Sequence, residues 1–159
     1  MYYLPKSVIE EISGYVQKQK ELLECYKAKN NFEMIYLVKW TILEKIVKEI
    51  ASQHRRVKLK ESLESWISYL DKNDKKPTEI NNFSIDSLNL PHERELKEAL
   101  KYYFLDSEKV WEVMNSKGIY RKYRNKLAHD AEAISETRFN KLFPELESLV
   151  DYFVKELKI

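Results

Sequence analysis

The sequence predicts an all-α protein, a helical bundle of about four to six helices with an up-and-down core. Two observations favour this class. The chain of 159 residues contains only 2 Gly and 4 Pro, so few residues interrupt helices. Apolar residues also recur mostly at spacings of three and four, as in helices with one buried face. With 43% hydrophobic and 34% charged residues, the chain suits one charge-coated soluble domain spanning residues 1–159.

The overall charge and the cysteine content narrow the possible functions. Lys and Arg number 28 against 26 Asp and Glu, so any nucleic-acid site must be a local patch. Cys25 is the single cysteine, which excludes an intrachain disulfide or a cysteine metal cage and favours a reducing compartment. Residues 1–6 lack the apolar core of a signal peptide, and no stretch reaches transmembrane length. We therefore expect a cytoplasmic protein without a membrane partner.

The first helix is predicted to start at Pro5 or Ser7, and Asn30–Asn31 to break the chain after it. The strongest periodicity follows this break. Its apolar positions are Ile35, Val38, Ile42, Leu43, Ile46, Val47 and Ile50. So broad a stripe predicts the central helix of the bundle, buried on more than one side.

A basic patch over residues 53–60 is predicted to lie at the junction into a third helix. That helix would carry Leu63, Trp66, Ile67 and Leu70. The cations can be a solvated helix end, where positive charge complements the helix dipole. Alternatively, Arg55 and Arg56 contact phosphate groups.

A long polar loop is predicted near residues 71–92, which contain Pro77 and Pro91. Its apolar residues are Phe83, Ile85, Leu88 and Leu90, so part of it should pack on the bundle. It could be an irregular insertion, a lid over a substrate groove or an arm that contacts a second subunit. Helix should resume near His92 or Glu93.

The last third of the chain is predicted to hold three more helical segments. Ser107 starts a turn or two, and Gly118 marks a break before a helix from Ile119. Ser135 should cap the final helix. Pro144 predicts either a kink in that helix or a helix that begins at Pro144.

The residues with the clearest chemical meaning lie between Tyr120 and Asp130, which read Tyr-Arg-Lys-Tyr-Arg-Asn-Lys-Leu-Ala-His-Asp. Arg124 is followed by Asn125, and four residues separate Arg124 from His129. This pattern resembles the Arg-x4-6-His motif of HEPN-domain ribonucleases. The order of several long helices, the motif, and a long final helix is similar to HEPN domains over most of the chain.

Helix geometry allows a test of this motif. On a straight α-helix Asn125 and His129 share a face, whereas Arg124 and His129 diverge by about 140°. The latter two can converge only if the long arginine reaches across and the helix distorts near His129. Core-facing positions are expected at Tyr120, Tyr123, Leu127 and Ala128.

The residue types suit RNA cleavage by the attack of a 2′-hydroxyl on the adjacent phosphate. A histidine can transfer the proton, and a guanidinium can stabilise the anionic phosphorane through paired donors, with no metal required. The resemblance implies a metal-independent endoribonuclease without a cofactor. Its composite site would contain Arg124, Asn125 and His129 of both subunits of a homodimer, in defence or in a toxin–antitoxin pair with an antitoxin or regulatory protein. Supporting or RNA-contacting roles would fall to Arg121, Lys122, Lys126, Asp130, Arg55 and Arg56.

Several alternatives remain open at this point. The HEPN fold also serves as an inactive module that binds a partner protein or nucleotide. The chain could also be a plain bundle whose surface near Arg55 contacts nucleic acid without chemistry. Arg124 could be a surface residue paired with Asp130 or Glu132, and Arg121 is a rival for the catalytic role. Ala131 stands where some HEPN toxins carry a tyrosine that is nucleotidylated by the antitoxin, which argues against that form of control.

A metal site is not expected. The three histidines, His54, His92 and His129, show no ligand spacing.

Overall fold

The computed structural model describes residues 4–72, 97–101, 107–115, 117–130, 133 and 135–159. Every regular element in these ranges is helical, which confirms the predicted all-α class. A short helical stretch at residues 97–101 accompanies the longer elements. The longer elements are α1 (Lys6–Ala28), α2 (Phe32–Lys72), α4 (Ser107–Met114), α5 (Ile119–Asn125), the π-helical turn η1 (Lys126–Asp130) and α6 (Glu136–Leu157).

The connection between α1 and α2 is a tight turn, as the paired asparagines predicted. Asn30 adopts a left-handed conformation with φ of 51°, which asparagine tolerates better than most residues. The side-chain Oδ1 of Asn31 accepts a hydrogen bond of 3.0 Å from the backbone N–H of Met34. This bond satisfies one of the free donors in the first turn of α2 and marks where the helix begins.

Helix α2 runs without interruption for 41 residues. The predicted junction over residues 53–60 is therefore wrong, and Leu63, Trp66, Ile67 and Leu70 continue the same helix. Cations suit a helix C-terminus but do not create one. No Gly or Pro occurs between Phe32 and Lys72, so nothing in this stretch breaks the backbone pattern.

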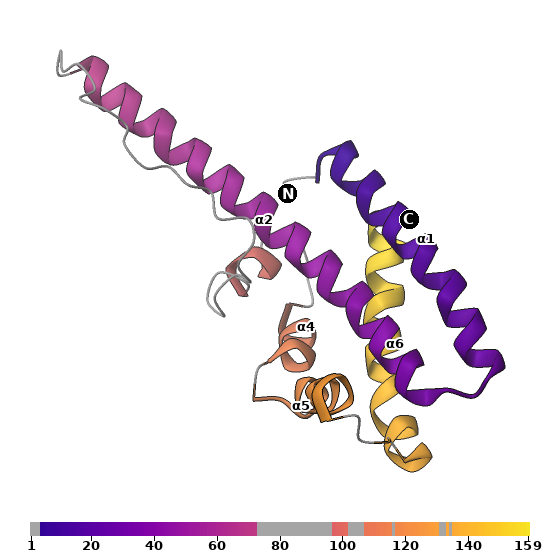
Figure 1. The fold of residues 1–159 in the computed structure, drawn as a ribbon. Coiled ribbons are helices and arrows are strands. Elements are labelled where there is room, and N and C mark those ends of the chain that lie inside the picture. Colours follow the sequence, from indigo (N-terminus) through magenta and orange to yellow (C-terminus); the bar gives the residue numbers. More distant parts are fainter. Residues whose placement is uncertain (1–3, 73–96, 102–106, 116, 131–132, 134) are drawn as a thin grey trace.

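The core forms where α1, the first half of α2 and α6 pack together (Figure 1). Helices α1 and α2 are antiparallel, whereas α6 runs parallel to α2. Phe139 near the start of α6 meets Phe32, and Asp151 further along meets Lys39. The most buried large side chains are Trp40, Tyr36, Phe153, Ile12, Ile42, Leu43, Ile46 and Ile50. The predicted central helix, buried on more than one side, is thus confirmed.

The other side of α2 is covered by shorter helices. Ala99 and Leu100 from the stretch 97–101 are buried, as are Val110 and Val113 of α4. A Cβ added at Gly118 would lie 3.1 Å from two backbone carbonyl oxygens, so the chain turns there in space that only glycine fits easily. The predicted starts of a helix at Ser107 and at Ile119 are both confirmed.

Helix α6 begins at Glu136, directly after Ser135, as predicted. The serine side chain makes no capping hydrogen bond, and its backbone carbonyl accepts bonds from the N–H groups of Arg138 and Phe139. The helix continues through Pro144, so the alternative of a helix starting there is wrong. Pro144 lies on the exposed side, where water can reach the carbonyl that lacks a donor.

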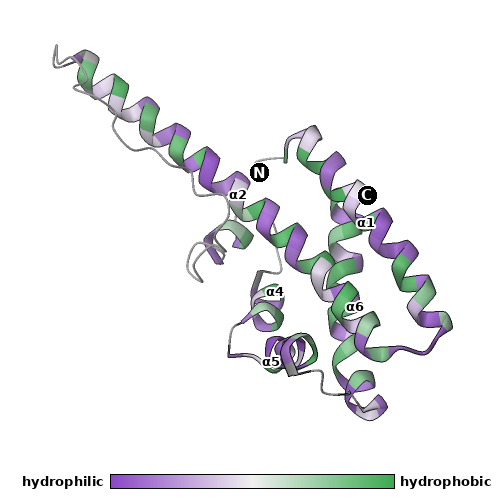
Figure 2. Cartoon of the chain, in the orientation of Figure 1, coloured by the Kyte–Doolittle hydropathy of each residue, from purple (hydrophilic) through white to green (hydrophobic). Residues whose placement is uncertain are grey.

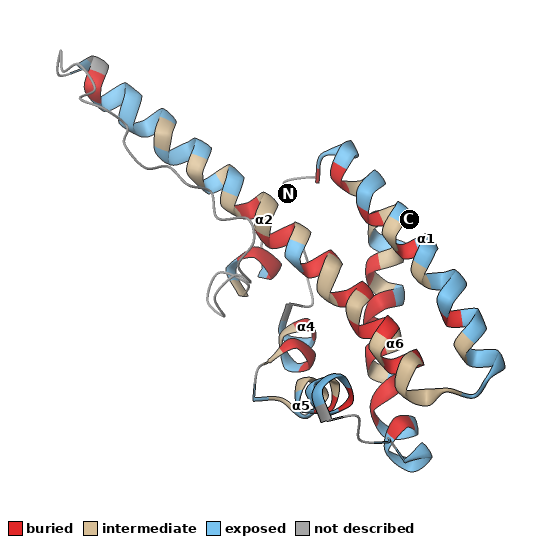
Figure 3. Cartoon of the chain, in the orientation of Figure 1, coloured by how far each residue is buried: buried red, intermediate tan, exposed pale blue. Residues whose placement is uncertain are grey.

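The second half of α2 extends away from the core as a projecting arm (Figures 1 and 3). We use this name for residues 56–72. Most of its side chains are exposed, and polar and apolar residues alternate along it (Figure 2). The predicted loop near residues 71–92 and the predicted helix start at His92 or Glu93 lie largely outside the described residues. Among the described helices, none is both long enough and apolar enough to cross a membrane.

Candidate functional site

The motif lies on α5 and on the turn that follows it. Helix α5 ends at Asn125, and the next five residues widen into a π-helical turn, Lys126–Asp130. A π-helix closes hydrogen bonds between residues five apart, whereas an α-helix closes them between residues four apart. The distortion near His129 that the motif geometry required is therefore present.

This turn changes which residues share a face. The wider turn reduces the angle between residues five apart from the roughly 140° of a straight α-helix, and Arg124, near the end of α5, and His129 have that spacing. The same change turns Ala128 outward, so its predicted core-facing position is wrong. Tyr123 and Leu127 are buried and Tyr120 is partly buried, as expected.

The motif helix is anchored to the core through Tyr36, which is fully buried. Its hydroxyl donates a hydrogen bond of 3.0 Å to the backbone carbonyl of Tyr120. Its ring centroid lies 6.4 Å from that of Tyr123. Burial raises the pKa of the Tyr36 hydroxyl, so the group stays protonated and keeps donating this bond.

Arg124 is held by two side chains. Its Nη1 donates to Oδ1 of Asn125 at 3.0 Å, and its Nη2 lies 3.5 Å from Oε2 of Glu44 on α2. The side chains of Arg124 and Glu44 are 28% and 15% exposed, so water screens this pair only in part. Glu44 also pairs with Lys48 at 3.6 Å.

Glu44 is a site residue that the sequence interpretation missed. The available signal was a carboxylate inside the most apolar stretch of the chain, next to the buried Leu43. Such a residue needs a partner. The predicted pairing of Arg124 with Asp130 or Glu132 cannot be compared, because those side chains lie outside the described part of the structure.

The remaining motif residues differ in how they are held. Asn125, Lys126, His129 and Lys122 are all exposed. Arg121 is half-buried, and its Nη1 donates a hydrogen bond of 3.4 Å to the backbone carbonyl of Met114. Arg121 thus points back towards the end of α4, whereas Arg124 faces α2.

Arg138, in the first turn of α6, is a second residue that sequence reasoning missed. Its guanidinium carbon lies 4.4 Å from the centroid of the Tyr123 ring, in a cation–π contact. The rest of the side chain is exposed. Because Tyr123 directly precedes Arg124, this contact brings another cation to the motif helix.

The segment that carries the motif is basic in sequence. Between positions 117 and 129 the chain carries only positive charges, at Lys117, Arg121, Lys122, Arg124 and Lys126. In a chain of near-neutral overall charge, nucleic-acid binding would require a local run of cations of this kind. Within the described residues, no group of three or more His, Cys, Asp or Glu side chains could hold a metal ion.

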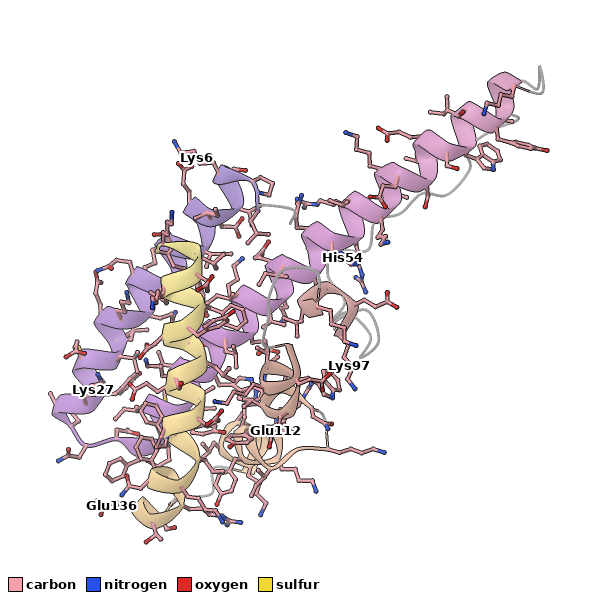
Figure 4. The ribbon with its side chains drawn as sticks, turned by 180° about the vertical axis from the view of Figure 1, so that it is seen from behind. Lys6, Lys27, His54, Lys97, Glu112 and Glu136 are labelled. Atoms are coloured by element: carbon pink, nitrogen blue, oxygen red, sulfur yellow. The ribbon has the colours of Figure 1, made fainter. Side chains whose placement is uncertain are left out.

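Arg55 and Arg56 lie elsewhere, on α2 beyond the core. Arg55 is eleven residues from Glu44, or about 16 Å along the helix axis. Arg56 lies towards α1, where it contributes to lowering the pKa of Glu11 after the larger effect of a hydrogen bond from Lys45. Figure 4 shows the neighbouring His54 on the same helix, away from Glu136 at the start of α6.

Comparisons with known proteins leave the family open. No family model, no curated protein and no solved structure matches this chain.

Proposed function

We propose that this protein is a metal-independent endoribonuclease of the HEPN type, with a composite site formed by two copies of the chain. The π-helical turn carries this proposal, because the wider turn reduces the angle between the side chains of Arg124 and His129 and so brings them towards one face. The surrounding cations supply the field that an RNA backbone needs. A cytoplasmic role in defence, or as a toxin controlled by an antitoxin or regulatory protein, is part of the same proposal.

The cleavage step uses only the RNA and the side chains. The 2′-oxygen attacks the adjacent phosphorus as His129 of one subunit takes the 2′-hydroxyl proton. Arg124 stabilises the charge on the phosphorane through paired N–H donors. The bond to the 5′-oxygen then breaks, and this oxygen receives a proton from the protonated histidine of the other subunit. The products carry a 2′,3′-cyclic phosphate and a 5′-hydroxyl.

Glu44 acts in this scheme as a positioning residue. Its carboxylate and the Asn125 amide fix the guanidinium of Arg124 from two sides. A side chain that is already oriented loses less conformational entropy when it binds a phosphate. Asn125 is exposed and can also bond the phosphate or orient a histidine.

In this proposal a second copy of the chain completes the catalytic site. Arg124 contacts Glu44 and Asn125, while His129 is exposed to solvent. A twofold axis near the motif would place the arginine of one chain opposite the histidine of the other. Lys122 and Lys126, also exposed, would then line the entry for the RNA backbone.

The test is cleavage of a labelled single-stranded RNA in EDTA. Arg124→Ala and His129→Ala should each reduce the rate by about 100-fold or more, because each removes a group that acts in the transition state. Glu44→Gln should cause a smaller loss, since the amide can still accept a bond. Ile119→Ala is the control from the same helix, because this side chain is 48% exposed and has no role in the scheme, and it should change the rate by less than about threefold.

Each variant must first show the helical content and the sedimentation mass of the wild type. Equal cleavage by all variants would contradict the proposal. So would the absence of cleavage by the wild type, a result that favours a second candidate. In that case the chain is an inactive module that binds a partner protein or nucleotide, consistent with an arginine whose charge Glu44 already balances.

A further inference from the structure

The projecting arm carries large apolar side chains in water. Trp66 and Tyr69 are 50% and 53% exposed and lie three residues apart, one turn along the helix. They border a hollow of about 700 Å³. Its lining is Lys58, Glu61, Ser62, Ser65, Trp66 and Tyr69. The core does not require these two aromatic rings, so their exposure calls for another explanation.

The hollow lies on the same face of α2 as the Arg124–Glu44 pair. At about 100° per residue, Glu44, Lys48, Arg55, Trp66 and Tyr69 all fall within about 60° of one another. The distance along the axis from Glu44 to Trp66 is about 33 Å. The stripe of these five residues, which we call the α2 track, runs along one side of the helix from the motif to the arm, with the buried Ala51 between Lys48 and Arg55.

Charged residues lie along the α2 track and beside the hollow. Lys48 and Arg55 occupy the middle of the α2 track. Glu64 is turned about 160° away from Trp66, whereas Glu61, about 80° from Tyr69, lines the hollow together with Lys58. Glu61 lies 4.0 Å from Lys58 and Glu64 lies 3.7 Å from Lys60. The track thus has two cations, Lys48, which pairs with Glu44, and Arg55, between the two aromatic side chains and the motif.

We infer that the α2 track binds single-stranded RNA, with unpaired bases stacked on Trp66 and Tyr69 and phosphates near Arg55 and Lys48. Cations that follow a backbone, combined with exposed aromatic rings, are how proteins hold single strands without reading sequence. A duplex keeps its bases stacked inside and cannot use the rings. The direction of the strand, towards Arg124, rests on the proposed function, whereas the binding itself does not.

The experiment measures the affinity for a labelled single-stranded RNA of about 16 nucleotides by fluorescence anisotropy. The protein is the full chain carrying His129→Ala, so that no cleavage interferes. Trp66→Ala and Tyr69→Ala should each weaken binding by at least about fivefold, the usual effect of removing one stacking side chain. Trp66→Phe should retain most of the affinity, because a ring remains.

Ile67→Ala is the matched control. Ile67 is 52% exposed, close to the 50% of Trp66, but it points about 100° away from Trp66 and should leave the affinity unchanged. Quenching of tryptophan emission on addition of RNA adds a readout that a folding defect alone would not produce. Trp40 is buried and Trp111 is half-buried, so quenching by RNA should come mainly from Trp66 and be lost in Trp66→Phe.

Cleavage of a three-nucleotide RNA separates the two proposals, because it is too short to reach from the motif to the arm. Without the His129→Ala change, the arm variants should cleave it at the wild-type rate. Binding that depends on Trp66 without any cleavage would refute the proposed function and support the α2 track.

Equal affinity of Trp66→Ala, Tyr69→Ala and the wild type for the 16-nucleotide RNA would overturn the inference. It would also be overturned if Trp66→Ala lowered the sedimentation mass and left RNA affinity intact. That result would make the arm a protein interface.

Discussion

The two halves of α2 share one helix but not one environment. From Ile35 to Ala51 most side chains are buried, including the full surface of Trp40 and Ile46. From residue 56 to Lys72, only Leu70 is buried among the described side chains, and Trp66 stands half in solvent. The difference shows that a continuous backbone does not imply continuous packing. A helix can be part of a core at one end and a surface for other molecules at the other.

The largest expected effect compares two tryptophans on this helix. Trp40→Ala should lower the free energy of unfolding by about 3–5 kcal/mol, because it opens a cavity in the core. Trp66→Ala should lower it by less than about 1 kcal/mol, since no packed core surrounds that ring. Urea denaturation followed by circular dichroism measures both. Similar losses would mean that the arm is packed in solution and would remove the contrast.

A smaller effect on stability is expected where the buried half of α2 contacts the motif helix α5. Tyr36→Phe removes the hydroxyl that donates to the Tyr120 carbonyl and keeps the ring in place. The loss should be about 1 kcal/mol, typical of one buried hydrogen bond. Tyr26→Phe on α1, a partly buried tyrosine, is the paired control and should change stability by less than about 0.5 kcal/mol. Equal effects would show that the bond to Tyr120 adds nothing to stability.

The smallest expected effect is on the pH dependence of stability. A hydrogen bond and the positive charge of Lys45 lower the pKa of Glu11 below its ordinary 4.5. Burial opposes the charge on Lys45, but its bonds to Glu11 and Glu49 outweigh burial and raise its pKa. The contribution of Glu11 is therefore present above pH 4.5 and is lost as the pH falls through its lowered value.

Glu11→Gln should accordingly reduce stability at pH 7 by less than about 1 kcal/mol, because Glu11 is largely exposed. The difference from the wild type should shrink below pH 4.5, and the contribution of Lys45 should persist until the pH exceeds its raised value. Urea midpoints between pH 3 and pH 8 test this. A constant difference across that range would show that the pair does not titrate as argued.

Much of the fold follows from local sequence patterns. The break at Asn30, the buried stripe from Ile35 to Ile50 and the turn at Gly118 were all predictable, because each depends on nearby residues. The length of α2 was not predictable in this way. Residues 53–60 contain four cations among residues that favour helices, and this pattern resembles the end of a helix. Only the absence of Gly and Pro indicated that the helix continues.

The candidate site was predictable in its residues more than in its geometry. Arg124, Asn125 and His129 are close in sequence, so their pattern could be found directly. Glu44 lies 80 residues away and Arg138 joins through a ring contact, so neither could be found without the tertiary structure. The outward position of Ala128 depends on the π-helical turn, which a straight helix does not anticipate.

That turn also affects how chain length can vary at the motif. A π-helical turn holds one residue more than an α-helical turn, so deletion of Ala128 could be absorbed by a return to regular helix. The arginine and the histidine would then stand four apart, which is the spacing that shares a face in an α-helix. Two chain lengths thus satisfy one geometry. A helix can therefore gain or lose one residue at this point without turning the arginine and the histidine apart.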